Sequence, residues 1–465
     1  MDKSGLPVVV IGAGPIGLAA AAHLIERGEA PVVVEAGSEV GHTIRQWGHV
    51  SMFSPWEYNI DQAAAKLLTA TGWTLPEKDE IPTGGELVER YLRPLAAVPE
   101  MRDRIRFGSK VVGVTRKHFD KVRTTGRADE PFVIRVRKSD GTEQIIEAKA
   151  VIDASGTWGS PNPAGSDGLP ALGEIRARDH IAYGIPDVLG KDIERYRGRM
   201  VMVVGGGHSA LNALIDLARL KGEDAAAHII WVMRKANIEA AYGGEEADGL
   251  QARGALGSTA RHLVESGLVQ VYSPFRIERI DQTEKGLVVS GDHSGSNREI
   301  RVDEMIVATG FRPDLGFLRE IRLTIDPWLE SSGQIGPLID PNLHSCGTVR
   351  PHGAKELSHE EPDFYIAGMK SYGRAPTFLL ATGHEQVRSI VAEIVGDHEA
   401  ARRVELVLPE TGVCSATPKL SADLKVADTA SCCGTPIKTM IPVAVSSSAD
   451  GCCGTPSPAP VSKCC

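Results

Sequence analysis

Two glycine-rich turns are the residues of this chain best suited to hold a charged ligand. The first reads GAGPIG at residues 12–17, between an apolar run at 8–11 and an alanine-rich run at 18–24. Glycines at this spacing allow a tight strand-to-helix turn, close approach of the backbone to a pyrophosphate, and close packing of helix on strand. Unpaired N–H groups at the start of the helix attract the phosphates. The pattern predicts a dinucleotide at this turn.

A carboxylate supports the first turn as a dinucleotide site. Glu35 follows the next apolar run, residues 31–34, where it can accept hydrogen bonds from ribose hydroxyls. A loop at 41–56 comes next and contains Arg45 and Trp47. These two side chains would contact a bound dinucleotide or its reactive ring, or the segment is an ordinary surface loop.

The second turn, GGGHSA at residues 205–210, again lies between an apolar strand and a helical run. The following strand, at 229–233, ends in Arg234 and Lys235 instead of a carboxylate. A guanidinium there would pair with the 2′-phosphate of NADP, so we expect an NADP site. The alternative is a solvated Arg-Lys pair beside an NAD site or a purely structural fold. His208 would contact a phosphate or serve as a polar turn residue.

The cysteines form the other group with chemical potential. Of eight cysteines, six stand in adjacent pairs near the C-terminus, and two of the pairs open a repeated CCGTP segment. Paired thiolates suit a soft acceptor such as trivalent arsenic or Hg(II), whereas the spacing typical of zinc sites is missing. Redox exchange with a partner, or no ligand role, are the alternatives. Soft metal or metalloid binding is expected at Cys432, Cys433, Cys452, Cys453, Cys464 and Cys465.

Length and composition limit the class of protein. A chain of 465 residues is long enough for two or three domains, and 42% hydrophobic with 24% charged residues is an ordinary globular balance. A net charge of -9 argues against nucleic acid or an anionic membrane as the main partner. The sequence has no apolar run long enough to span a membrane, and its N-terminus lacks the basic region of a signal peptide. We therefore expect a cytoplasmic protein.

The elements that must position these residues follow from hydrophobic periodicity. Two apolar strands, at 151–156 and 304–310, are expected to end in small residues where the chain passes from one half to the other. Small residues at these strand ends let a ligand lie across the sheet. The helix at 381–395 would place Gln386, Val387 and Arg388 near its beginning, close to a cofactor. The other expected elements are a helix at 86–95, strands at 110–114, 132–136, 143–148, 151–156, 304–310 and 364–368, a linker at 159–170, and β structure at 271–302.

The two turns, joined by Asp153-Ala154-Ser155-Gly156 and Ala308-Thr309-Gly310, resemble the flavoproteins with two dinucleotide-binding domains over residues 6–398. Residues 153–163 and 308–313 are similar to the flavin-containing monooxygenase group. The resemblance implies an α/β fold of two Rossmann-like, three-layer ββα domains, the first holding FAD and an inserted second holding NADPH. The expected bounds are 1–165 and 306–410 for the FAD domain, 166–305 for the NADPH domain, and 411–465 for a disordered, Cys-rich tail.

The resemblance also implies which residues contact each cofactor. For FAD they are Gly12, Ala13, Gly14, Pro15, Ile16, Gly17, Glu35, Ala36, Arg45, Trp47, Val111, Gly156 and Gly368. For NADPH they are Gly205, Gly207, His208, Ser209, Ala210, Arg234 and Gly310.

Two departures from related flavoproteins bear on the reaction. The FxGxxxHxxxY/F signature of typical flavin monooxygenases is absent from the linker. The redox cysteine pair of disulfide reductases is absent from the body as well, and Gly368 is followed by Met369 instead of aspartate. This argues against an internal-disulfide mechanism. With its paired-cysteine tail, the chain resembles the flavoproteins of bacterial arsenic-resistance operons, and the tail is similar to the vicinal pair of mercuric reductase.

The predicted function is that of an FAD- and NADPH-dependent oxidoreductase, a monooxygenase-like enzyme that uses O₂ on a small soft substrate such as an arsenical delivered by the tail. The alternatives are an NADPH-dependent metal or disulfide reductase with tail thiols as the relay, and a non-catalytic metalloid-binding protein. Candidate catalytic residues are Cys464, Cys465 and Cys346, with His344 and His352 as further candidates. A homodimer is also a possible assembly.

Overall fold

The computed structural model describes residues 3–222, 226–248, 250–343, 350–375 and 378–406. The tail from residue 411, with its six paired cysteines, lies outside the described residues, as do His344 and Cys346. None of the described helices combines the length and the apolar character that crossing a membrane requires.

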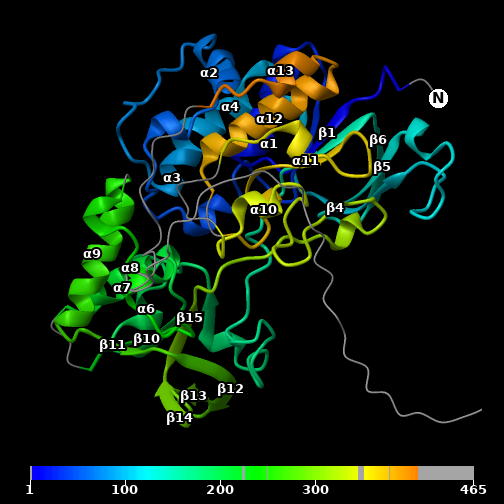
Figure 1. Ribbon diagram of the computed structural model, residues 1–465. Helices are drawn as coiled ribbons and strands as arrows, with labels where there is room; N and C mark the ends of the chain where they lie inside the picture. Colours follow the sequence, from blue (N-terminus) through cyan, green and yellow to red (C-terminus); the bar gives the residue numbers. More distant parts are fainter. Residues whose placement is uncertain (1–2, 223–225, 249, 344–349, 376–377, 407–465) are drawn as a thin grey trace, which may run out of the picture. The chain divides into compact units, whose positions relative to one another are not determined.

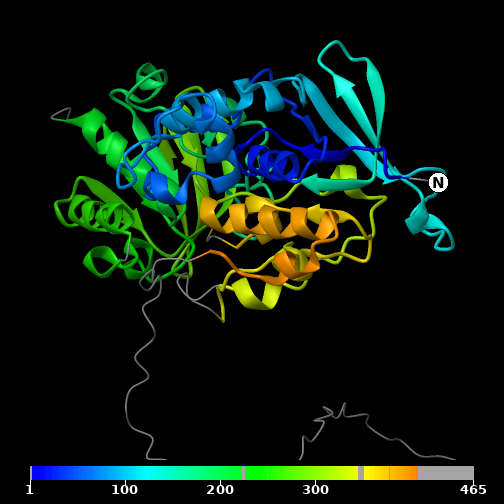
Figure 2. The same cartoon turned by 90° about the horizontal axis from the view of Figure 1, so that it is seen from above.

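The first sheet is parallel, with strand order β16-β7-β1-β2-β3. Successive side chains of β1 point to opposite faces, and both faces are covered. Val8 and Val10 pack with the helices α1 and α12, which lie side by side (Figures 1 and 2), whereas Val9 and Ile11 pack against a three-stranded antiparallel sheet. The bounds are β1 Val8–Ile11, β2 Val32–Val34, β3 Ile105–Arg106, β7 Ala150–Asp153, β16 Phe364–Ile366, α1 Pro15–Glu26, α12 Leu380–Ile394, β4 Ser109–Arg116, β5 Phe132–Lys138 and β6 Glu143–Ala148.

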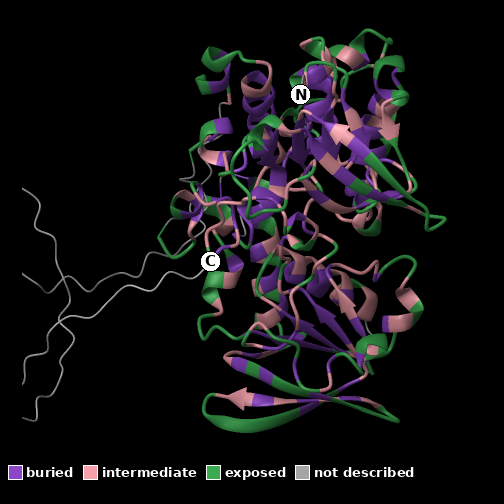
Figure 3. Cartoon of the chain, turned by 90° about the vertical axis from the view of Figure 1, so that its right-hand side faces the viewer, coloured by how far each residue is buried: buried purple, intermediate pink, exposed green. Residues whose placement is uncertain are grey.

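The second sheet repeats this construction, with strand order β11-β10-β9-β15-β8, all parallel. Val201 and Val203 of β9 face the helices α7 and α9, whereas Met202 and Val204 face a second antiparallel meander. Figure 3 shows these buried strands between more exposed outer layers. The bounds are β8 Ile181–Tyr183, β9 Met200–Val204, β10 His228–Val232, β11 Val269–Tyr272, β15 Glu304–Val307, α7 His208–Lys221, α9 Gln251–Glu265, β12 Phe275–Thr283, β13 Gly286–His293 and β14 Ser296–Val302.

The predicted α/β fold with two three-layer ββα units is therefore confirmed. Strand β15 crosses the boundary expected at residue 305 and pairs within the second sheet. Apart from the helical segment at 84–97, the remaining described helices of more than three residues are η1 Ile44–Trp47, α2 Gln62–Thr69, α5 Pro99–Arg102, α6 Ile193–Tyr196, α8 Glu239–Tyr242, α10 Gly336–Ile339, α11 Ala354–Leu357, η8 Gly368–Tyr372 and α13 His398–Arg402.

The helix expected at 86–95 is interrupted. It consists of α3 (Gly84–Leu87), a π-helical turn η3 (Val88–Leu92) and α4 (Arg93–Ala97). Pro94 has no N–H, so it cannot bond the carbonyl of Arg90 one turn earlier. The indole Nε1 of Trp73 donates to that carbonyl at 2.9 Å instead. A proline inside an otherwise helical pattern therefore explains the difference from a regular α-helix.

A buried ion network joins the first meander to the strand β16. Glu361 accepts hydrogen bonds from Arg116 Nε at 2.8 Å and from Arg127 Nη2 at 2.8 Å, and all three side chains are almost fully buried. Arg116 also lies over the ring of Phe132, 3.6 Å from its centroid. Burial opposes ionisation of Glu361, but the two guanidinium groups outweigh burial, so the net effect lowers its pKa.

Removing the Glu361 charge should destabilise the protein strongly. Glu361→Gln leaves two buried guanidinium groups without their carboxylate, and breaking a buried pair in this way typically costs about 3–5 kcal/mol. The free energy of unfolding, measured by guanidinium chloride denaturation, should fall by this amount. The matched control is Glu143→Gln in the exposed pair with Arg137, which should change stability by less than about 1 kcal/mol. Equal effects of the two substitutions would contradict a structural role of the buried network.

Candidate functional site

In the first glycine turn, backbone atoms fill the space that a side chain would need at Gly12 and at Gly17, whereas the space at Gly14 is open. Gly12 has φ +102°, and a Cβ there would lie 2.8 Å from the carbonyl oxygen of Ala154. A Cβ on Gly17 would overlap the carbonyl oxygen of Gly12, whereas one on Gly14 would meet no atom of the described residues within 4 Å. Gly14 caps α1 without a side-chain hydrogen bond. The open space above Gly14, at a helix N-terminus, fits the pyrophosphate of a dinucleotide.

Glu35 stabilises this turn from the end of β2. Its carboxylate accepts hydrogen bonds from the backbone N–H of Ala13 at 2.7 Å and from that of Gly37 at 2.7 Å. The side chain therefore lies beside the turn, with Ala36 next to it in the chain. Each carboxylate oxygen can accept more than one hydrogen bond, so a ribose contact is compatible with these two. That contact stays a prediction.

Two further turns meet the first one at the carboxyl ends of β7 and β16. Gly156 has φ +71°, and in the part of the chain that the structure describes no atom lies within 4 Å of its Cβ position. Gly368 has φ +72°, and its Cβ position lies 3.1 Å from Ile16 in the first turn. Parallel strands place such turns on one edge of the sheet. The structure thus brings together the 12–17 turn, Gly156 and Gly368.

A buried ion pair that the sequence did not indicate lies beneath these turns. Lys370 Nζ is 2.7 Å from Asp153 Oδ2 and 3.1 Å from Ser155 Oγ, and both members of the ion pair are fully buried. The ammonium also lies 4.4 Å from the centroid of the Phe317 ring. These contacts bond the segment after β7 to the segment after β16. Lys370 therefore holds these two segments in position, and its ammonium group donates to protein atoms.

The loop residues proposed for FAD have protein partners. Arg45 forms ion pairs with Glu39 at 2.8 Å and Glu89 at 2.7 Å. The ring of Trp47 lies 6.2 Å from that of Trp158. Val111 lies on β4 with its side chain in the core. Contact of Val111 with a ligand would therefore involve its backbone.

The second glycine turn has the same design. Gly205 has φ +130°, and its Cβ would overlap the carbonyl of Ala308 after β15, whereas no described atom lies within 4 Å of the Cβ position of Gly207. Gly207 caps α7 without a side-chain bond, and Ser209 lies in the first turn of the helix. Ala210 is fully buried. The space above Gly207 fits a second pyrophosphate by the same argument.

His208, the first residue of α7, lies beside Phe53 in the 41–56 loop, which comes after β2. Its ring centroid lies 5.5 Å from that of Phe53. Burial lowers the pKa of His208, and the nearby Arg253 adds to this effect, so the ring is neutral at pH 7. Arg253 itself is paired with Asp248 at 2.7 Å. The sequence motif did not indicate either Phe53 or Arg253, because neither stands in the glycine pattern.

Arg234 follows β10 and Gly310 follows β15, the two strands on either side of β9 in the second sheet. Arg234 is exposed shortly after β10, and its Nη1 donates to the carbonyl of Ser166 at 3.4 Å. Gly310 has φ +91°, and its carbonyl accepts the N–H of Asn162 at 2.9 Å. An exposed guanidinium at this edge is available to a phosphate.

Two residues of the helix that was expected near a cofactor have protein partners. Arg388 forms an ion pair with Glu385 at 2.7 Å and donates to the carbonyl of Ala400, so its closeness to a cofactor stays a prediction. Gln386 lies in the second turn of α12 and bonds the backbone of Gly368. Among the described residues, no group of three or more His, Cys, Asp or Glu side chains is placed to bind a metal ion.

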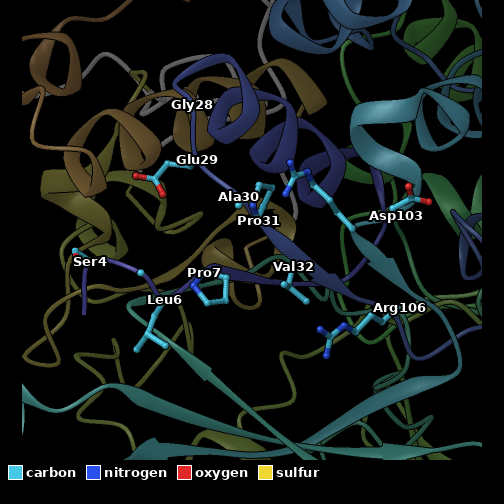
Figure 4. A pocket seen from close by; sticks show the side chains of 12 residues that line it. Ser4, Leu6, Pro7, Gly28, Glu29, Ala30, Pro31, Val32, Asp103 and Arg106 are labelled. Carbon is cyan, nitrogen blue, oxygen red and sulfur yellow. The ribbon is translucent and has the colours of Figure 1, made fainter. Parts of the chain in front are cut away.

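A surface pocket lies away from these turns. Figure 4 shows it at the amino ends of β1, β2 and β3, between segments that include Leu6, Pro31 and Asp103. The glycine turns follow the carboxyl ends of β1 and its neighbours, at the opposite edge of the sheet. In open parallel sheets ligands bind at the carboxyl edge, so this pocket is not the nucleotide site.

Comparison with known proteins agrees with this geometry. A family model described as pyridine nucleotide-disulphide oxidoreductase matches residues 9–332. The chain is 25% identical over 240 residues to the flavin-containing monooxygenase FMO GS-OX-like 2 of Arabidopsis thaliana, a match that covers 46% of this chain and about half (48%) of that protein. It is 25% identical over 357 residues to the ferredoxin–NADP reductase of Rhodospirillum rubrum, covering 74% and 81%. The bacillithiol disulfide reductase Bdr of Bacillus cereus superposes with a TM-score of 0.62 at 20% identity, covering 86% of this chain and 99% of that one.

Substitution of two glycines in the first turn should separate ligand binding from folding. Gly14→Ala places a methyl group in open space, so the fold should persist while affinity for FAD falls about tenfold or more, equivalent to about 1.4 kcal/mol. Gly17→Ala forces α1 away from Gly12 and should destabilise the fold by about 1–3 kcal/mol, the usual range for overpacking. Flavin content and thermal denaturation measure the two effects. Unchanged flavin content in folded Gly14→Ala would contradict a pyrophosphate at this position.

Proposed function

The chain belongs to the pyridine nucleotide-disulphide oxidoreductase family, and we propose that it is a monooxygenase that reduces its FAD with NADPH. As a member, it is an NAD(P)H-dependent FAD oxidoreductase. One observation carries the use of two nucleotides: two glycine turns of the same design, each with one glycine open to a ligand, stand at the carboxyl edges of two parallel sheets.

The proposed roles follow the placement of the residues. Gly14 and Glu35 would hold FAD, and Gly207 with Arg234 would hold NADPH. When bound, NADPH supplies a hydride to FAD, and the reduced flavin supplies the electrons for the final acceptor. Burial lowers the pKa of His208, so its ring would offer a phosphate at the α7 N-terminus a neutral N–H donor, beside the backbone N–H groups and Arg234.

Oxygen is the acceptor that agrees best with the composition of the body. Cys346 is the only cysteine before residue 414, so residues 1–413 cannot form an internal disulfide of the kind a disulfide reductase uses. The likeness to a flavin-containing monooxygenase supports the same choice. The proposed overall reaction is NADPH, H⁺, O₂ and substrate giving NADP⁺, water and the oxygenated substrate.

We also propose a soft substrate, with an arsenical as the leading example. The support is chemical: three separate pairs, each of two adjacent cysteines, supply thiolates, which prefer soft acceptors. Capture of a thiophilic metalloid by these pairs would raise its concentration near the enzyme and place the protein in metalloid detoxification.

The requirement for oxygen tests the proposed reaction class. In air, NADPH should be oxidised continuously with about one O₂ consumed per NADPH, whereas under argon turnover should stop after the bound FAD has been reduced once. An oxygen electrode and absorbance at 340 nm give the two rates. Continued anaerobic turnover with a disulfide or Hg(II) would instead support a reductase, the second candidate favoured by the similarity to the bacillithiol disulfide reductase.

Replacing the tail cysteines tests the substrate class separately. The full-length chain with all six paired cysteines changed to serine should retain its FAD content and its NADPH oxidation. Its affinity for arsenite or Hg(II), measured by equilibrium dialysis, should fall at least about tenfold, since serine oxygens are poor ligands for soft ions. A chain ending at residue 410 is the matched comparison and should behave alike. Unchanged metalloid affinity in both variants would exclude capture by the tail.

A further inference from the structure

Gln386 uses its whole side-chain amide to hold the turn that contains Gly368. It is fully buried on α12. Its Oε1 accepts the backbone N–H of Gly368 at 2.8 Å, and its Nε2 lies 3.0 Å from Ser371 Oγ and 2.9 Å from His352 Nε2. Ser371 in turn donates to the carbonyl of Gly368 at 2.7 Å. Both amide hydrogens and the amide oxygen are therefore engaged.

The contact between the two nitrogens defines the state of the His352 ring. An amide NH₂ has no lone pair to share, so His352 Nε2 must accept and carry no hydrogen. The hydrogen is then on Nδ1, which donates to the carbonyl of Arg350 at 3.2 Å. Burial lowers the pKa of His352, which favours this neutral form.

Other charged or titratable groups near His352 have smaller effects on its pKa than burial has. Glu356 favours protonation and Arg350 opposes it, but these two side chains are themselves paired at 3.6 Å. From η8, the ring of Tyr372 lies 5.4 Å away, and burial raises the pKa of that phenol, so it stays neutral. From α12, the contact is the uncharged Gln386.

Protonation of His352 is incompatible with the observed hydrogen bonds. Both ring nitrogens would then be donors, and Nε2–H would face the NH₂ group of Gln386. Turning the amide by 180° would offer its oxygen to His352 but would point its NH₂ at the N–H of Gly368. In either orientation a buried donor loses its acceptor, which is unfavourable in the protein interior.

The Gly368 turn is in direct contact with the first glycine turn. The Cβ position of Gly368 lies 3.1 Å from Ile16. Ile16 lies in the first turn of α1, between Gly14 and Gly17. A displacement of the Gly368 turn therefore changes the surface on which FAD is expected to lie.

We propose that His352 is a pH-sensitive positioning residue for FAD, which keeps Gln386 oriented on Gly368 when neutral and releases this turn when protonated. The proposal rests on the assignment of FAD to the first glycine turn. Because the neutral ring supports binding, affinity should be complete at neutral pH and should be lost as the pH falls through the lowered pKa of the ring, below about 6.5. One proton is involved, so the dissociation constant should rise at most about tenfold per pH unit.

The experiment measures FAD binding to the FAD-free full-length chain between pH 7.5 and 5.0, from the change in flavin fluorescence, with far-UV circular dichroism as a check on folding. We expect affinity to fall at least about fivefold across this range in the unsubstituted chain. His352→Gln places an amide oxygen, which does not titrate, near the position that the ring Nε2 occupies in the unsubstituted chain. This variant should therefore bind FAD with little dependence on pH. Gln386→Glu offers a carboxylate that can accept from Gly368 and from protonated His352, so its binding should persist at pH 5.5.

A second buried histidine is the matched control. His359 contacts Thr324 and Phe364, and burial lowers its pKa to about 4. His359→Gln should keep the acid sensitivity of the unsubstituted chain. Equal pH profiles for His352→Gln and the unsubstituted chain would overturn the role of His352 while leaving the FAD assignment intact. Failure of the unsubstituted, folded chain to bind FAD at pH 7.5 would refute that assignment and the proposal with it.

Discussion

Each nucleotide turn depends on a backbone carbonyl that occupies the place of a missing side chain. The carbonyl of Ala154 lies against Gly12, and the carbonyl of Ala308 lies against Gly205. Any side chain at either glycine would separate the central strand from its neighbour, because neither carbonyl can leave its position without disturbing a parallel strand. This constraint explains why a glycine is required at each of these two positions.

The two layers on either side of each sheet follow from the same strands. In β1 and β9 alternate residues are buried against helices on one face and against an antiparallel meander on the other. Strands buried on both faces cannot alternate apolar with polar residues, so they appear as continuous β-branched or methionine-containing runs. Rigid sheets of this kind fix the positions of the turns at their carboxyl edges, and those turns carry the residues assigned to the cofactors.

Local patterns were sufficient to predict most of the fold. The glycine spacing indicated both strand-to-helix turns, and the alternation at 132–136 and 143–148 indicated the hairpin formed by β5 and β6. Pro94 explains the interruption of this helix, but the donor to the carbonyl of Arg90 was not predicted, because Trp73 lies outside the helix. Ion pairs and amide contacts such as those of Lys370 and Gln386 were missed for a related reason. They join elements far apart in the chain, and no periodicity within either element encodes them.

The two segments that connect the sheets, around Pro161 and around Phe311, are bonded to each other. Pro161 and Phe311 form an antiparallel bridge, Asn162 donates to Gly310, Arg312 donates to Ser160, and the rings of Trp158 and Phe311 stack at 4.7 Å. The segments therefore behave mechanically as one short two-stranded ribbon. Any reorientation of one nucleotide-binding unit against the other during turnover would have to twist this ribbon as a whole, because bending either segment alone would break the bonds that join them.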